Sequence, residues 1–354
     1  MNRLSRKSEN GFTLLEVMIA MFVTLIIVTG AVQLFTQAMQ TSDLTMQRSE
    51  VQTEVRAALN QIERDLSQAG TGVPQGGVAI PSAAKAGADP NFACDASQCY
   101  IGANVPFTQG TLYSVTPGSA VGPTITEPSD AIKITYVDPN LDWSASSTTS
   151  ITPGGTSLTM PAGTNPPVND PAVGITPGDV VLLQNSIGSA VGVATSVSAS
   201  TIVFGLDPLN LNQSGAPTGN IRSIATPTTT TYPPTKVSRL VMITYFLQNL
   251  VTPDGPDARL MRQEGTHPPV PIAEHIEDLR ITYDIVDGTT GALTANLPNA
   301  VGGIPPLPEP NQIRKIKINI TGRSFRPGLK NNVQRVNLST SIGPRNLSFK
   351  DRYQ

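Results

Sequence analysis

The most prominent feature of the hydrophobic pattern is one long apolar stretch near the start of the chain. In residues 12–35 almost every side chain is apolar or small, and the single charged side chain is Glu16. A helix of about 20–24 such residues is long enough to cross the hydrocarbon core of a bilayer, about 30 Å thick. A carboxylate near the start of such a segment costs roughly 2.5 kcal/mol or more on insertion scales, which indicates that Glu16 has a specific task.

A second helical pattern follows directly. In residues 44–69 apolar positions recur at spacings of three, four and seven, which is typical of an amphipathic helix. The apolar stripe consists of Leu44, Val51, Val55, Ala58, Leu59, Ile62, Leu66 and Ala69, and its polar counterpart of Glu50, Glu54, Arg56, Glu63, Arg64 and Asp65. Gly70 is a stop signal, and the first proline is Pro74. We therefore predict one helix over residues 12–69, about 85 Å long. Its first half packs in a membrane or filament core, and its second half docks under a globular head.

Beyond Gly70 the period changes to two, which is typical of half-buried strands. The expected strands are 112–115, 130–137, 157–160, 178–183, 190–198, 201–205, 239–247, 258–263, 276–283, 313–322 and 333–342. The three between 178 and 205 predict a small antiparallel sheet or partial barrel. The last five predict an antiparallel sheet that lays one face on the amphipathic helix, with turns at Asp254-Gly255 and Asp287-Gly288.

These patterns predict an α+β protein with four regions. Residues 1–11 form a leader, 12–69 the long helix, 70–235 a Gly/Pro/Thr-rich β insertion, and 236–354 the antiparallel β head. Charged residues make up only 14% of the chain, with 30 Gly and 31 Pro, as in an extracytoplasmic β domain with long loops. The formal net charge of −2 does not suggest a nucleic-acid partner, which would call for a basic patch. No catalytic constellation is recognisable, so we expect neither enzymatic activity nor a cofactor.

The residues before the apolar stretch narrow its role. Arg3, Arg6 and Lys7 make the leader basic, and it ends in Gly11. A secretory signal would have a shorter apolar region followed by a small-x-small cleavage site. A plain signal anchor explains the length and the basic flank, but it leaves Gly11 and Glu16 unexplained. In either case the basic leader stays in the cytoplasm, so the residues after the apolar stretch face the periplasm or the outside.

The sequence Gly11-Phe12-Thr13-Leu14-Leu15-Glu16 resembles the class III signal of the type IV pilin superfamily. The resemblance implies that a prepilin peptidase cleaves after Gly11 and methylates the new N-terminal Phe12. It also implies that Glu16 pairs with the N-terminal amine of a neighbouring subunit during assembly. Such an assignment is physically sensible, because a positive amine in low-dielectric surroundings needs an opposite charge.

Later segments extend the resemblance to PilW-family minor pilins. They include ALNQIERDLSQAG at the helix end, PIAEHIEDLRITYD, IRKIKINITGRS and VNLSTSIGPRN. The resemblance implies a minor subunit that primes type IV pilus assembly, near the tip. Its partners are other minor and major pilins, the prepilin peptidase and an inner-membrane assembly platform. The subunit crosses the inner membrane once, with a periplasmic head, before it enters an extracellular pilus. Two alternatives remain: a GspJ-like type II secretion pseudopilin and a membrane-anchored surface adhesin.

Few other residues suggest chemistry. Cys94 and Cys99, the two cysteines, predict a local disulfide in an oxidising compartment, since a metal site would need further ligands nearby. We interpret His267 and His275 as loop and strand-edge residues. Asp284 and Asp287, with Gly288, lack the density of oxygen ligands of a calcium loop and favour a hairpin turn. We therefore expect no metal.

Overall fold

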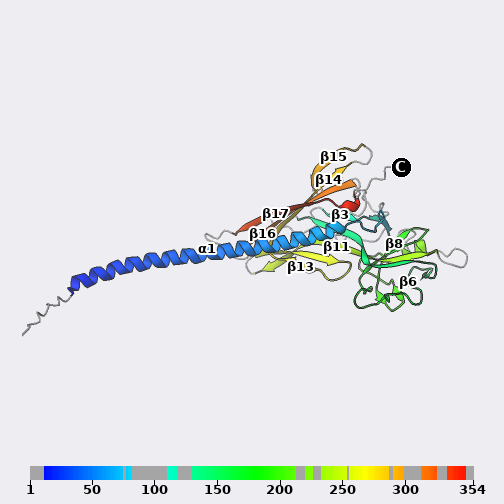
Figure 1. The fold of residues 1–354 in the computed structure, drawn as a ribbon, viewed down its shortest axis with the longest axis horizontal. Coiled ribbons are helices and arrows are strands. Elements are labelled where there is room, and N and C mark those ends of the chain that lie inside the picture. Colours follow the sequence, from blue (N-terminus) through cyan, green and yellow to red (C-terminus); the bar gives the residue numbers. More distant parts are fainter. Residues whose placement is uncertain are drawn as a thin grey trace, which may run out of the picture. The chain divides into compact units, whose positions relative to one another are not determined.

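The computed structural model describes residues 12–74, 77–81, 110–118, 129–212, 220–225, 233–252, 255–286, 290–298, 312–324 and 333–347. The architecture is α+β, with one long helix followed by antiparallel sheets (Figure 1). The chain divides into two units. The first contains residues 1–50 and 324–334, and the second contains residues 51–323 and 335–354.

The helix α1 runs from Leu14 to Gln68 without interruption, which confirms the predicted single helix. Gly30 does not break it, and a side chain at this position would meet no atom within 4 Å. The helix ends where Gly70 adopts a φ of +82°, a left-handed conformation that favours glycine. The Gly70 amide then donates to the Thr135 carbonyl oxygen of the neighbouring sheet, 3.0 Å away.

Within the described ranges, the strands of the second unit form four antiparallel sheets. The largest has seven strands: β3 (Val115–Gly118), β4 (Ala131–Ser146), β7 (Val180–Gln184), β8 (Ser189–Val193), β11 (Thr235–Thr252), β12 (Gly255–Glu264) and β13 (Val270–Ala273). A four-stranded sheet has the order β15 (Leu293–Pro298), β14 (Ile276–Val286), β16 (Ile313–Arg323), β17 (Arg335–Ile342). A smaller one has the order β5 (Ser150–Ile151), β6 (Ser157–Thr159), β10 (Thr201–Val203), β9 (Ser196–Val197). β1 (Val78–Ile80) pairs with β2 (Gly110–Leu112), and short 3-10 helices span Ile221–Ile224 and Arg345–Leu347.

Strand β11 is the centre of the large sheet. One edge pairs with β4, and the other pairs first with β7 and then, further along, with β12. Both faces of β11 are buried. Val241, Ile243 and Tyr245 join the core that contains α1, whereas Leu240 and Met242 join a second apolar cluster.

The main core forms where the second half of α1 meets two sheets. Its members from α1 are Val51, Val55, Ala58, Leu59, Ile62 and Leu66, and Ala69 follows directly after the helix. The seven-stranded sheet contributes residues such as Ile134 and Ile243, and the four-stranded sheet contributes residues such as Ile281 and Ile318. Burying an aliphatic side chain stabilises the fold by roughly 1.5–3 kcal/mol, so this stripe attaches the helix firmly.

The sheet assignments expected from sequence need correction. The last five predicted strands exist, but they divide between two sheets: β11 and β12 belong to one, and β14, β16 and β17 to the other. The strand expected at 190–198 is two strands, β8 and β9, which lie in different sheets. β7 and β8 are part of the large sheet, because β7 pairs with β11 over Lys236–Leu240. Strands from either side of residue 235 therefore share one sheet.

Asp65 is the main correction within the helix. The sequence pattern placed it on the polar face, yet it is only 4% exposed. It follows Ile62 by three residues and Ala58 by seven, which is the spacing of the apolar stripe itself. The Tyr245 hydroxyl and the Arg262 Nε, 3.0 Å away, both donate to its Oδ2. A buried charge is tolerated because it has these partners.

The surface of the four-stranded sheet carries an ion pair that predicts a pH dependence. Arg335 on β17 donates two hydrogen bonds, of 2.6 and 2.9 Å, to Glu277 on β14. These bonds hold the pKa of the Glu277 carboxyl below its ordinary value of 4.5, against the opposing effect of burial. The pair therefore stabilises the fold above that value, and the stabilisation is lost as the pH falls through the lowered pKa.

We predict that Arg335→Gln lowers the free energy of unfolding at pH 7 by up to about 1 kcal/mol, a modest effect because the Arg335 side chain is 58% exposed. The deficit should shrink as the pH falls below 4.5 and through the lowered pKa of Glu277. Urea denaturation of the full chain in detergent, at pH 7 and at successively lower pH, measures it. A deficit that keeps its size as the pH falls would contradict the assignment. Arg56→Gln, on the exposed face of α1, serves as the control.

Candidate functional site

The first turn of α1 is closed by two side chains. The Thr13 backbone N–H and its hydroxyl donate to Glu16 Oε2 at 2.9 and 3.0 Å. The Glu16 N–H donates in turn to the Thr13 hydroxyl at 3.3 Å. Thr13 immediately precedes the first helical residue, so Thr13 and Glu16 form a capping box. Glu16 therefore caps its own helix, a role that our sequence interpretation missed although the Thr-x-x-Glu spacing carries its signal.

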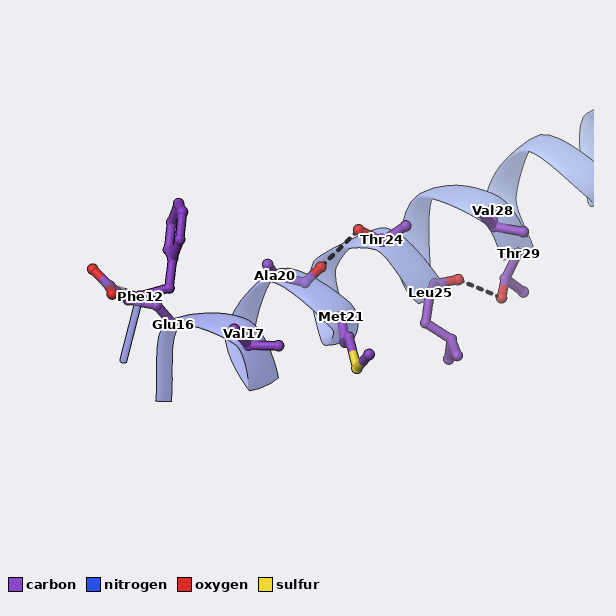
Figure 2. A pocket seen from close by; sticks show the side chains of 9 residues that line it. All are labelled: Phe12, Glu16, Val17, Ala20, Met21, Thr24, Leu25, Val28 and Thr29. Atoms are coloured by element: carbon purple, nitrogen blue, oxygen red, sulfur yellow. Dashed lines mark hydrogen bonds between the residues drawn. The ribbon is translucent and has the colours of Figure 1, made fainter. Parts of the chain in front are cut away.

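Phe12 and Glu16 lie together at the start of an open apolar groove along α1. Figure 2 shows the groove, whose other lining residues are Val17, Ala20, Met21, Thr24, Leu25, Val28 and Thr29. All of these side chains come from α1 or from the residues just before it, so the groove is a face of one helix and not an enclosed cavity. The Phe12 side chain is 87% exposed, and Glu16 is exposed as well.

The threonines of this segment do not need water. The hydroxyls of Thr24 and Thr29 donate to the carbonyl oxygens of Ala20 and Leu25, each at 2.7 Å, as Figure 2 shows. Thr36 donates to the Val32 carbonyl oxygen at 2.9 Å. Because each hydroxyl is satisfied by its own helix, these side chains are compatible with an apolar environment.

The first half of α1 presents a continuous apolar surface. Large apolar side chains from Phe12 to Met46 are exposed, among them Phe22, Ile27 and Phe35. By length and composition, α1 is the helix in the described part of the chain that can cross a membrane. The apolar stripe of the second half, from Val51 onward, is instead buried in the head core.

The remaining sequence candidates do not gather at this site. His267 lies in the loop after β12, and His275 lies between the end of β13 and the start of β14, in agreement with the predicted loop and strand-edge positions. His267 Nε2 is 2.8 Å from Asp179 Oδ1, and His275 Nδ1 is 2.6 Å from Asp257 Oδ2. Within the described ranges, no group of three His, Cys, Asp or Glu side chains is placed to hold a metal ion. Gly11, Cys94, Cys99, Asp287 and Gly288 lie outside the described residues, so cleavage and the disulfide stay predictions.

Comparison with known families adds one finding. Residues 6–32 match the family model for the prokaryotic N-terminal methylation motif. The chain carries a prepilin-type methylation motif. The match includes Gly11, Phe12 and Glu16, and it supports a precursor of the type IV pilin or pseudopilin kind. No curated protein and no solved structure matches the chain.

The capping box lies next to Phe12 and within the matched motif, which suggests a test of the box. Thr13→Val removes the hydroxyl from the helix start while it keeps the size of the side chain. Losing an N-cap costs about 1 kcal/mol. We expect hydrogen exchange at the amides of residues 14–17 to become about fivefold faster, as measured by mass spectrometry on the full chain in micelles. Thr24→Val, inside the helix and beyond its first turns, should leave these amides unchanged. Equal rates in the Thr13→Val variant and the native chain would show that the box does not hold the first turn.

Proposed function

We propose that this protein is a minor pilin of a type IV pilus. Its precursor is cleaved after Gly11, Phe12 becomes the methylated N-terminus, and α1 inserts the subunit into the inner membrane. The subunit then enters the filament with its β head outside the membrane. Its role is structural, and it helps to prime assembly from a position near the pilus tip.

The observation that carries this proposal is the placement of one acid at the start of an otherwise apolar exposed helix, inside the methylation motif. Cleavage would place a new positive amine on Phe12, four residues before Glu16. Neighbouring subunits would then bring an amine and a carboxylate together away from water, where their attraction is strongest. The Thr13 bonds both end on Oε2, and a carboxylate has a second oxygen that accepts further donors.

Assembly replaces one apolar environment with another. The exposed side chains of residues 12–46 would exchange lipid for the helices of other pilins, at little hydrophobic gain, so packing and the buried ion pair must decide which subunits associate. The second half of α1 is already committed to the head core. The head comprises most of the chain, and this bulk favours a sparse, tip-proximal position over the repeating shaft.

The cleavage step predicts an unprocessed precursor when Gly11 is replaced. In Gly11→Leu the bulky side chain should block the peptidase, so the chain keeps its basic leader. Intact mass spectrometry of the membrane fraction would show the full precursor, whereas the native protein begins at a methylated Phe12. Gly30→Ala is a matched control, since α1 has room for a side chain there. A normally processed Gly11→Leu chain would refute the cleavage site.

Glu16→Gln should spare membrane insertion and leader cleavage, yet reduce incorporation into sheared pili at least about tenfold, because the uncharged amide does not neutralise the neighbouring amine. Immunoblots of pilus and membrane fractions measure both quantities. Glu63→Gln, at an exposed position of the same helix, is the control. Unchanged incorporation would overturn the ion-pair role.

The Glu16→Gln variant also distinguishes a type IV pilus subunit from a type II secretion pseudopilin. If it impairs twitching and leaves type II secretion intact, the pilus assignment stands. The reverse result would make the chain a pseudopilin. Immunogold labelling along the whole shaft would argue against a tip position.

A further inference from the structure

The contact between α1 and the head is chemically repetitive. Its helical side is a row of aliphatic side chains spaced by three and four residues, and its sheet side is mostly Ile, Val and Leu. A slip of four residues keeps part of this contact apolar, because Val55 then takes the place of Val51 and Leu66 that of Ile62, while Glu63 takes the place of Leu59. Hydrophobic burial is non-directional, so among the apolar positions it distinguishes weakly between registers, and charged side chains must carry the distinction.

Asp65 breaks this repetition. It is the charged side chain among the buried residues of α1, and both of its donors come from one cross-strand pair, because Tyr245 of β11 lies directly opposite Arg262 of β12. The two donors converge on the same oxygen, Oδ2. Arg262 also donates to Glu264 Oε2 at 3.1 Å, so its guanidinium is held from a second side.

We propose that the Asp65–Tyr245–Arg262 cluster sets the axial register of α1 in the head. A slip of four residues moves the helix by about 6 Å along its axis. This exceeds the reach of any hydrogen bond, so Asp65 would lie charged and unpaired in the core while Arg262 lost its acid. Other registers are thus penalised by electrostatics, even at positions where one aliphatic side chain replaces another.

The electrostatics of the cluster agree with this role. Burial, and next the adjacent Asp65 carboxylate, raise the pKa of the Tyr245 hydroxyl, so that tyrosine remains a donor. Burial alone would lower the pKa of the Arg262 guanidinium, but Asp65, Tyr245 and Glu264 outweigh it and raise that pKa. Burial and the Asp65 charge also raise the pKa of nearby Tyr136 to about 12. Tyr245 therefore stays neutral and Arg262 stays charged over the physiological range.

The inference does not depend on the proposed function, but it bears on it. The register determines how many residues separate Glu16 from the point at which α1 enters the core at Val51. A slip of one turn changes that separation by four residues.

The test compares apolar replacement of the cluster with the native chain. The triple variant Asp65→Leu, Tyr245→Phe, Arg262→Met keeps the core filled without polar partners. Spin labels at Arg56→Cys and Arg345→Cys, both exposed, report the register in a background with both native cysteines replaced by Ser. Asn346, next to Arg345, bonds the Ala69 carbonyl oxygen, so the two labels are separated along the axis by about 20 Å. Pulsed EPR on the full chain in micelles measures their distance.

The chain with the native cluster should show a single distance between the two spin labels. The triple variant should remain folded, with a thermal midpoint close to the native one, and show a second distance displaced by about 6 Å. The fraction of molecules at this second distance should be at least about tenfold larger in the triple variant than in the chain with the native cluster. A single unchanged distance in the triple variant overturns the proposal. Failure of that variant to fold overturns it as well, because the cluster would then supply stability instead of register.

The pair Glu277→Gln, Arg335→Gln is the control and should leave the distance unchanged. The measurement requires neither leader cleavage nor a filament, so it is independent of the pilin assignment.

Discussion

The burial of the second half of α1 between strands of two sheets is the constraint on which the rest of the head depends. One stripe of the helix contacts the large sheet through residues such as Ile243 and the four-stranded sheet through residues such as Ile318. The backbone also links the two sheets, since the Asp130 amide on the β4 side donates to the Leu279 carbonyl oxygen of β14. Without the helix, both sheets would expose an apolar face to water.

The close approach of the helix to β16 shows how tightly this core is packed. A side chain at Gly322 would place its Cβ 2.8 Å from methyl groups of both Val51 and Val55. Glycine is required here because the helix occupies the space of a side chain. Overpacking of this kind typically costs 1–3 kcal/mol, about as much as the core gains from one aliphatic side chain.

The two halves of α1 face different environments for a physical reason. The first half leaves its apolar side chains exposed and satisfies its few polar groups internally, through the Thr13–Glu16 capping box and the threonine hydroxyls. The second half hides its apolar stripe and pairs its buried acid across the core. An exposed apolar helix is costly in water, so the first half requires lipid or other helices as its surroundings. This division agrees with a subunit that moves from a membrane into a filament.

Local patterns determined much of this protein. The helical period and the absence of proline before Pro74 predicted α1, and alternation predicted strands such as β11, β14 and β16. The motif around Glu16 was also readable, because cleavage and methylation signals are contiguous residues. The tertiary structure alone decided which strands pair: β7 and β8 belong with β11, which is more than 40 residues away in sequence, and alternation contains no information about such partners. It alone also decided that Asp65 is buried, since a charge enters a core only where distant residues, here Tyr245 and Arg262, arrive to pair with it.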